Sequence, residues 1–493
     1  MIRVKKETVK KQPKFWNHAL FHPTDAIEDP WGRRILDRIA ADGAIKTIRM
    51  YSMFEDIVYT NEEGELCFDF RLSDLRLDYL LEKGFEPLIA YGGMPDCIAS
   101  STNLTASFSK NKTRYKGKLW NSAPPRDFLQ WEEICYEYTK HLVERYGEER
   151  VAGWHCHCFN EPDGSFWMIN VPKDDIEPRC AAYCKLYEAF VRGVRRASKG
   201  IRVGGPALAH RVSFFDRFLA HIKQSGVELN YVALHTYGTG PDKLNSGERP
   251  LATENHFLYA IEPYRETMRK YGFEDVEMIL DEWGAASHGF YNVEECPSFL
   301  FRENEIYAAY FTKLIYQLIA SGINISKLMI CLSGQHEMVT DFSGFRNFFT
   351  LHFITKPIYN AHLMTSKLGD LLVEAECINE NVFVVPTKNE AGSYSVMLTY
   401  CSKNFKTDLP TLEETISFEA DLKGKTVTVY CIDAEHTNPY RTWERAGKPE
   451  MTDEMIRSLR EESKLKPIFI TSASDAPISL TLTPNATFLI TVE

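Results

Sequence analysis

The sequence has few of the features that mark membrane, secreted or nucleic-acid-binding proteins. Nowhere do about 18 apolar residues follow one another, which excludes a long apolar membrane-spanning helix. The lysine-rich residues 1–14 lack the apolar stretch of a signal peptide, so we expect a soluble, cytoplasmic protein. Lys and Arg number 57 against 68 Asp and Glu, a net charge of −11, which disfavours binding to a polyanion. We therefore expect neither a membrane nor a nucleic acid as a partner.

The 12 cysteines do not form the dense framework of a small disulfide-rich domain. We expect most of them to be reduced, buried core residues. Only Cys156-His157-Cys158 invites a metal interpretation. Alternation along a strand places the two cysteines on one face and His155 and His157 on the other, so no four-ligand set forms locally. We expect no metal site, and keep a metal-dependent enzyme built on residues 155–158 as an alternative.

The chain of 493 residues alternates apolar, β-rich runs with helical patterns, which is typical of βα units around a parallel sheet. Residues 127–147 show the helical pattern well, with apolar residues at spacings of three and four before Gly147. No glycine-rich dinucleotide turn follows the first run, which disfavours a doubly wound sheet. Eight runs predict a (β/α)8 TIM barrel: 15–21, 46–52, 86–93, 151–161, 201–207, 231–238, 277–284 and 327–334.

Beyond residue 369 the pattern changes to short alternating strands separated by Asn, Gly, Asp and Pro turns, which predicts a β-sandwich. One helix is expected at 452–463, with Thr452 as its N-terminal cap. We therefore predict three parts: an N-terminal extension (1–14), a catalytic (β/α)8 barrel (15–368), and a C-terminal β-sandwich accessory domain with one helix (369–493).

Two glutamates end predicted strands of the barrel. Glu161 ends strand four and Glu282 ends strand seven. The active site of such a barrel lies at the carboxyl ends of its strands, so both side chains should reach one mouth. Cleavage of a glycosidic bond needs two such carboxyl groups, one to protonate the leaving oxygen and one to stabilise or capture the sugar carbon. The pair therefore predicts a glycosidase.

Other polar residues at strand ends fit the same site. Arg49 lies in an apolar strand, where a charge must be paired, and an obvious partner is the nucleophile carboxylate, which an Arg would keep ionised. His235 and Tyr237 end strand six and are candidates to contact the sugar and a carboxylate. The alternative for these two is a buried histidine and a rim tyrosine.

These motifs resemble the retaining glycosidases with (β/α)8 barrels, and within them glycoside hydrolase family 39, which holds β-xylosidases and α-L-iduronidases. Three further stretches point to that family: 68–88, 203–207 and 433–449. The resemblance covers nearly the whole chain and rests first on these motifs: Asn160-Glu161-Pro162-Asp163, His235-Thr236-Tyr237 and Asp281-Glu282-Trp283.

The resemblance implies that Glu161 is the general acid/base, that Glu282 is the nucleophile, and that Asn160 hydrogen-bonds the sugar 2-hydroxyl. It implies a retaining exo-glycosidase, with β-xylosidase as the leading activity, acting on an oligosaccharide or small glycoside. The double displacement requires no metal and no organic cofactor. The sequence leaves the oligomeric state open, with a homo-oligomer as one option.

The chain departs from the β-xylosidase pattern around this pair. Phe159 replaces a Trp, His157 a Glu and Tyr51 a His, and residues 330–333 lack the usual strand-eight Trp. Trp283, directly after the nucleophile, has two interpretations: an aromatic wall that replaces the missing Trp, or plain core packing.

Three alternatives stay open beside β-xylosidase. Another specificity, such as β-glucosidase, α-L-arabinosidase or α-L-iduronidase, would use the same glutamates, and an iduronidase would need a cation for the substrate carboxylate. The second is a non-catalytic carbohydrate-binding barrel, and the third is the metal-dependent enzyme named above.

Overall fold

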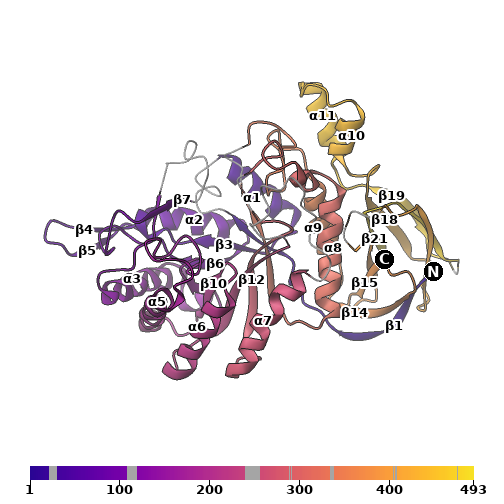
Figure 1. Cartoon of the computed structure of the whole chain (residues 1–493). Coiled ribbons are helices and arrows are strands. Elements are labelled where there is room, and N and C mark those ends of the chain that lie inside the picture. The colour runs from indigo at the N-terminus through magenta and orange to yellow at the C-terminus, as the bar shows by residue number, and fades with distance from the viewer. Residues whose placement is uncertain are drawn as a thin grey trace.

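The computed structural model describes residues 1–21, 30–107, 119–238, 256–287, 289, 291–333, 338–403, 405, 408–474 and 476–493. They form a barrel and a separate curled sheet, with helices α8 (Glu305–Ala320) and α9 (Pro357–Ser366) between the two (Figure 1). Gly334, the last residue of the eighth predicted strand, lies outside the described residues.

The barrel is closed by eight parallel strands, and every one of the eight predicted runs supplies one of them, so the predicted fold class is confirmed. Neighbouring strands pair in parallel throughout. Around the barrel the strands are β2 (His18–Phe21), β3 (Thr47–Tyr51), β6 (Glu86–Tyr91), β9 (His155–Cys158), β10 (Arg202–Leu208), β11 (Tyr231–Tyr237), β12 (Glu277–Gly284) and β13 (Lys327–Leu332).

Helices cover the outside of the barrel. The helix predicted at 127–147 is α3 (Phe128–Tyr146), where the Asp127 side chain accepts the Leu129 N–H and Gly147, with φ of 85°, ends the helix. The other helices of this part are α1 (Pro30–Asp42), α2 (Arg71–Glu82), α4 (Glu148–Val151), α5 (Ile176–Ala197), α6 (Val212–Ser225) and α7 (His256–Tyr271), with 3₁₀ turns Phe54–Asp56 and Pro297–Glu303. Two small hairpins complete it: β4 (Val58–Thr60) with β5 (Leu66–Phe68), and β7 (Thr105–Ser107) with β8 (Leu119–Asn121).

Buried apolar side chains from five barrel strands, β6, β10, β11, β12 and β13, form one cluster, as expected when alternate residues of each strand point inward. They are Leu88, Ala207, Tyr231, Ala233, Ile279 and Met329.

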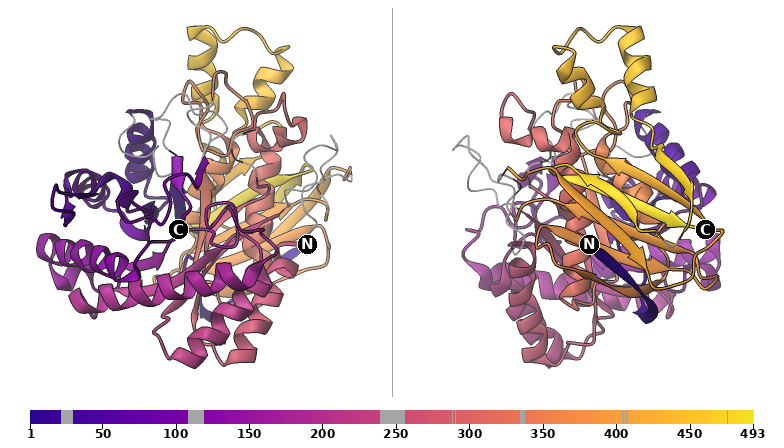
Figure 2. Two further views of the ribbon diagram at one scale, coloured as in Figure 1. Left: turned by 60° about the vertical axis from the view of Figure 1, so that its left-hand side comes forward. Right: turned by 90° about the vertical axis from the view of Figure 1, so that its right-hand side faces the viewer.

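The C-terminal part is one curled, mixed sheet whose nine strands enclose a single apolar core. Residues 1–14 are not a separate extension, because β1 (Ile2–Lys11) pairs with β14 in antiparallel and β17 in parallel orientation. The right view of Figure 2 shows this N-terminal strand beside the C-terminal ones. In sheet order the strands are β19 (Pro467–Ser472), β18 (Thr426–Ile432), β21 (Ala486–Val492), β16 (Tyr394–Tyr400), β15 (Val382–Lys388), β14 (Leu371–Cys377), β1, β17 (Leu412–Phe418) and β20 (Ile478–Leu482).

Two helices, not the single predicted one, interrupt this sheet. The predicted helix is α11 (Asp453–Glu462), and the side chain of Thr452 caps it by accepting the Met455 N–H. The second, α10 (Pro439–Arg445), is a short helix that follows Asn438. Both rise above the curled sheet at the top of Figure 1, and Tyr440 and Leu459 pack against Phe342 and Ile354. Helices α10 and α11 therefore pack against the segment that follows β13.

Helix α8 also joins the two parts. Its buried Thr312 lies with Oγ1 2.6 Å from Oγ1 of Thr399 and 3.2 Å from that of Thr487, both on the curled sheet. No helix among the described residues is long and apolar enough to cross a membrane. No disulfide joins any of the 12 cysteines, all of which belong to the described part of the chain.

Candidate active site

Glu161 follows β9 on a backbone of unusual shape. Phe159 and Glu161 have φ of 63° and 45°, in the left-handed region that L-residues other than glycine rarely adopt. The neighbouring strands hold this turn, since the Phe159 N–H donates to Tyr91 O (2.8 Å) and the Glu161 N–H to Ala207 O (2.9 Å). The turn leaves the Glu161 side chain partly exposed, at 19%.

Glu282 lies on β12 and is held through both oxygens. Nη1 of Arg49 donates to Oε1 at 2.8 Å, so the pairing expected from the sequence is present. The hydroxyl of Tyr237 donates to Oε2 at 2.9 Å. These two contacts fix the carboxylate in position and in rotation.

Arg49 also links the two predicted glutamates, because it contacts Asn160, the residue before Glu161. Its Nη2 donates to Oδ1 of Asn160 at 2.7 Å, and its Nε donates to Nε2 of His157 at 3.2 Å. Burial, together with the charge of Arg49, lowers the pKa of His157 to about 3, so this ring is a neutral acceptor. Arg49 itself is completely buried and fully paired. This pairing offsets the free-energy cost of burying its charge inside the barrel.

His235 bridges the two glutamates. Its Nδ1 lies 2.8 Å from Oε1 of Glu161 and 3.6 Å from Oε2 of Glu282. Burial would lower the pKa of His235, but the carboxylates of Glu282 and Asp281 raise it to about 10. Burial would likewise raise the pKa of Glu282, but the charges of His235 and Arg49 outweigh it and hold that pKa below its usual range. Glu282 is therefore ionised at neutral pH, beside an imidazolium.

Trp283 does not line the site, so the prediction that it forms an aromatic wall is wrong. Its ring is completely buried and stacks on Phe311 of α8, with centroids 5.4 Å apart. Successive side chains of a strand point to opposite faces, so the residue after the inward Glu282 points out into the helix layer.

The sequence interpretation missed two charged residues at the site. Asp281, next to Glu282, is completely buried with Oδ2 3.0 Å from Nε of Arg49. Arg346 follows β13, and its guanidinium lies 5.1 Å from the Tyr237 ring centroid. Two consecutive carboxylates in an apolar strand were a signal for Asp281, whereas no local pattern marks Arg346.

As predicted, the two histidines of β9 lie on one face of the strand and its two cysteines on the other. His155 pairs with Glu277 (3.2 Å) and His157 with Arg49, while Cys156 and Cys158 are buried in the core. Two other donor groups within the described residues are close enough for a metal ion: Cys431, Asp433 and His436; and Glu161, His235 and Glu282. In the second group a metal ion would have to displace the proton on Nδ1 of His235, because only a deprotonated ring nitrogen offers a lone pair.

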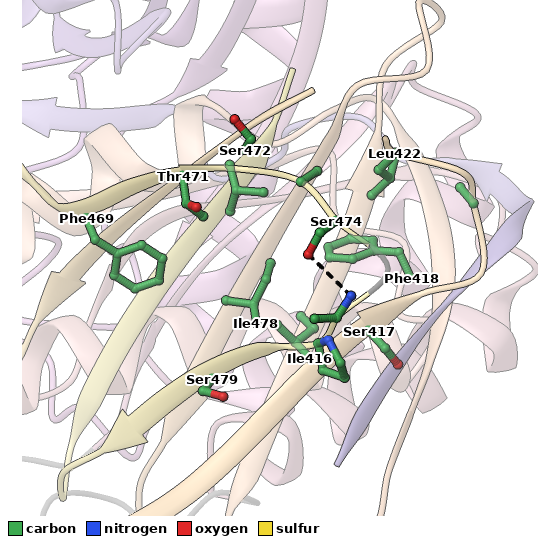
Figure 3. A pocket seen from close by; sticks show the side chains of 15 residues that line it. Ile416, Ser417, Phe418, Leu422, Phe469, Thr471, Ser472, Ser474, Ile478 and Ser479 are labelled. Atoms are coloured by element: carbon green, nitrogen blue, oxygen red, sulfur yellow. Dashed lines mark hydrogen bonds between the residues drawn. The ribbon is translucent and has the colours of Figure 1, made fainter. Parts of the chain in front are cut away.

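A cavity of about 470 Å³ lies in the curled sheet, away from these residues (Figure 3). It opens between β17, β18, β19 and β20 and is lined by apolar and hydroxyl side chains such as Phe418, Phe469 and Ser479. None of its described lining residues is ionisable, so it offers no acid or base.

A closed (β/α)8 barrel with two glutamates at its mouth defines the class of the protein as a barrel glycoside hydrolase. The chain belongs to Glycosyl hydrolases family 39, whose profile matches residues 1–474. The expected family resemblance is thereby confirmed, as is the assignment to glycoside hydrolases.

Similar proteins agree with this assignment. A "Beta-xylosidase" of Caldicellulosiruptor saccharolyticus is 24% identical over 509 aligned residues, which cover 97% of this chain and 95% of that protein. An "Alpha-L-iduronidase" of Canis lupus familiaris is 25% identical over 251 residues, 46% of this chain and 34% of that protein. A crystal structure of a monomeric beta-xylosidase from Caulobacter crescentus CB15 has a TM-score of 0.84 at 19% identity, covering 100% of this chain and 99% of that one.

Proposed function

We propose that the protein is a retaining exo-glycosidase, with β-xylosidase as its leading activity. The observation that carries the mechanism is the spacing of the two carboxyl groups. One oxygen of Glu161 and one of Glu282 lie within 4.8 Å of each other. Retaining enzymes place these groups about 5–5.5 Å apart, whereas inverting enzymes need about 6.5–9.5 Å to admit a water molecule.

In this proposal Glu282 attacks the anomeric carbon while Glu161 protonates the leaving oxygen, and Glu161 then deprotonates the water that releases the sugar. Arg49 and Tyr237 keep Glu282 ionised and aimed. Asn160, which Arg49 orients, is the proposed partner of the sugar 2-hydroxyl. The chemistry uses side chains of the chain alone, so we propose that it needs no cofactor.

Xylose is the leading sugar because two β-xylosidases, of Caldicellulosiruptor saccharolyticus and Geobacillus stearothermophilus, align over 97% and 90% of this chain. The experiment is a panel of nitrophenyl glycosides, with the anomeric configuration of the first product followed by proton NMR. We expect the highest kcat/KM on the β-D-xyloside and a β-configured product. An α-configured first product would contradict the double displacement.

A second candidate, a hydrolase of uronic-acid glycosides such as an α-L-iduronidase, is favoured by Arg346. This buried guanidinium lies over Tyr237, and its Nε donates to Oγ of Ser333 at 3.1 Å. No carboxylate of the described residues lies within ion-pair distance of it. A substrate carboxylate could supply the missing charge-assisted hydrogen bonds.

The Arg346→Met variant separates the two candidates. If the substrate is a uronide, kcat/KM on a fluorogenic α-L-iduronide should fall by about 100-fold, because charge-assisted hydrogen bonds are strong in a buried site. Cleavage of the neutral xyloside should fall much less, because Arg346 affects it only through its charge near Glu282 and its contact with Tyr237. A wild-type enzyme that cleaves the xyloside but no uronide would exclude the second candidate.

A further inference from the structure

Asp281 lies beneath the proposed nucleophile because β12 carries a bulge. On β11, Leu234 pairs with Leu280 and the next residue, His235, pairs with Glu282, so Asp281 has no opposite residue. The pairing of β12 with β13 shifts at the same place. In a regular strand Asp281 and Glu282 would point to opposite faces, whereas a bulge can turn both toward one. Both reach Arg49, so both point into the barrel.

Three nitrogen atoms converge on one oxygen of Asp281. Its Oδ2 lies 3.0 Å from Nε of Arg49, 3.4 Å from Nε2 of His157 and 3.6 Å from Nε2 of His235. His157 is neutral and already accepts the Arg49 N–H, so the two cations at this carboxylate are Arg49 and His235. A carboxylate with no exposed surface needs such cations to stay ionised. Asp281 is therefore the counter-ion of the two groups that hold the glutamates.

The groups facing His235 determine its proton count. Glu161 comes from the turn after β9, Asp281 and Glu282 come from β12, and the neutral His157 and the charged Arg49 lie beyond Asp281. The carboxyl groups of all three residues lie within 3.6 Å of the ring, and the two negative charges of Asp281 and Glu282 favour the imidazolium, in which both ring nitrogens carry a proton.

The protonation of His235 decides which oxygen of Glu161 carries the acid proton. An imidazolium donates from Nδ1 to Oε1, so the proton of Glu161 sits on Oε2, which has no other hydrogen-bond partner in the described part of the chain. A neutral ring with its proton on Nε2 would accept at Nδ1 and draw the Glu161 proton to Oε1. That proton would then be directed at His235 and away from a substrate.

We propose that Asp281 is a positioning residue for the acid/base step, because its carboxylate keeps His235 doubly protonated. Nδ1–H of His235 then donates to Oε1 of Glu161, and Oε2 is the oxygen that gives and takes the proton. Oε2–H gives its proton to the glycosidic oxygen as that C–O bond breaks and Glu282 bonds to the anomeric carbon. Oε2 later takes a proton from the water whose oxygen displaces Glu282. His235 keeps both protons throughout. This inference rests on the proposed roles of Glu161 and Glu282.

The Asp281→Asn variant tests the inference through its pH profile. Removing a negative charge disfavours every protonated form of the His235–Glu161 pair, so the alkaline limb of kcat/KM should move to lower pH by about one unit. The rate on an alkyl glycoside, which needs the acid, should fall by about 10- to 100-fold, while cleavage of a dinitrophenyl glycoside changes little. An unchanged alkaline limb would overturn the inference.

Histidine NMR supplies a readout that does not depend on hydrolysis. In protein labelled with ¹⁵N-histidine, the His235 signal is the one missing from His235→Gln. We expect wild-type His235 to remain an imidazolium at pH 8 and to be neutral there in Asp281→Asn. A neutral His235 in the wild type at pH 7 would overturn the inference. A wild type that hydrolyses no glycoside would overturn the proposed function and leave this readout intact.

A double-mutant cycle and a matched control complete the test. If Asp281 acts through His235, the double variant should be hardly slower on the alkyl glycoside than His235→Gln alone, and multiplied losses would contradict that route. The control is Asp433→Asn, which alters another Asp–His pair (3.0 Å) in the turn after β18, where Asp433 is buried and His436 is half exposed. It should lower stability without moving the alkaline limb. If Asp281→Asn does not fold, wild-type NMR still decides the protonation of His235.

Discussion

The turn after β9 and the end of β12 each present a glutamate, and they hold it in opposite ways. Glu282 is gripped on both oxygens, by Arg49 and Tyr237, and its side chain is 10% exposed. Glu161 receives one contact, from His235 on Oε1, and is 19% exposed. In the proposed mechanism, the group that must stay ionised and attack is therefore fixed in place, whereas the group that must give and recover a proton keeps one oxygen free of contacts.

Removing Glu282 should have the largest effect on that contrast. Glu282→Ala takes away the attacking group, so hydrolysis of every substrate should fall by about four orders of magnitude or more, whatever the leaving group. Steady-state kinetics on an alkyl and a dinitrophenyl glycoside measure this. Any product formed with added azide should have inverted configuration, because azide would attack from the vacated side.

Removing Glu161 should instead give a loss that depends on the leaving group. Glu161→Ala should cleave an alkyl glycoside about 10²- to 10⁴-fold more slowly, while dinitrophenolate still leaves readily in the first step. The glycosyl-enzyme should accumulate and azide should restore turnover, giving a glycosyl azide of retained configuration. If the azide products of the two variants had exchanged configurations, the two roles would be reversed.

Weakening the grip on Glu282 should shift its protonation. The depressed pKa of Glu282 keeps the active, ionised form down to low pH, so losing a cation should raise that pKa and move the acidic limb of the rate profile upward. For Arg49→Met we expect a shift of about one unit or more. Arg49→Lys keeps the charge and should shift it less. An acidic limb that stays in place in Arg49→Met would remove Arg49 from this role.

The smallest effect is expected for Tyr237, the uncharged one of the two residues that hold Glu282. Tyr237→Phe keeps the ring under Arg346 but removes the hydroxyl that donates to Oε2 of Glu282. A hydrogen bond to a charged group of this kind corresponds to about a tenfold loss in kcat or somewhat more. The acidic limb should rise less than in Arg49→Met, and a larger shift would mean that the hydroxyl, not the guanidinium, sets the charge of Glu282.

The sequence was sufficient for the barrel because each βα unit is coded locally. All eight predicted runs form barrel strands, and the strand-end rule brought Glu161, Glu282, Arg49 and His235 together. The pairing of β1 with β14 was not predictable in this way, since it joins residues more than about 350 positions apart and depends on tertiary packing.

The errors at the site have different causes. Strand alternation predicts opposite faces for neighbouring residues, and the bulge in β12 breaks that rule for Asp281 and Glu282. The bulge brings Asp281 into the site beside Glu282, whereas Trp283 points outward by ordinary alternation after Glu282. Arg346 was missed for a different reason, because it comes from an irregular segment that hydrophobic periodicity does not describe.

The left-handed backbone of Glu161 implies that stability and activity oppose each other at this residue. A residue with a Cβ in that region costs about 1–2 kcal/mol, and only glycine escapes the cost. Glu161→Gly and Glu161→Ala both lack the carboxyl group. The free energy of unfolding should therefore be about 1 kcal/mol larger for Glu161→Gly, which should also unfold at a higher temperature. If stability alone were selected, glycine would be favoured at this position. The glutamate found there lowers the stability of the fold in exchange for a carboxyl group at the candidate site.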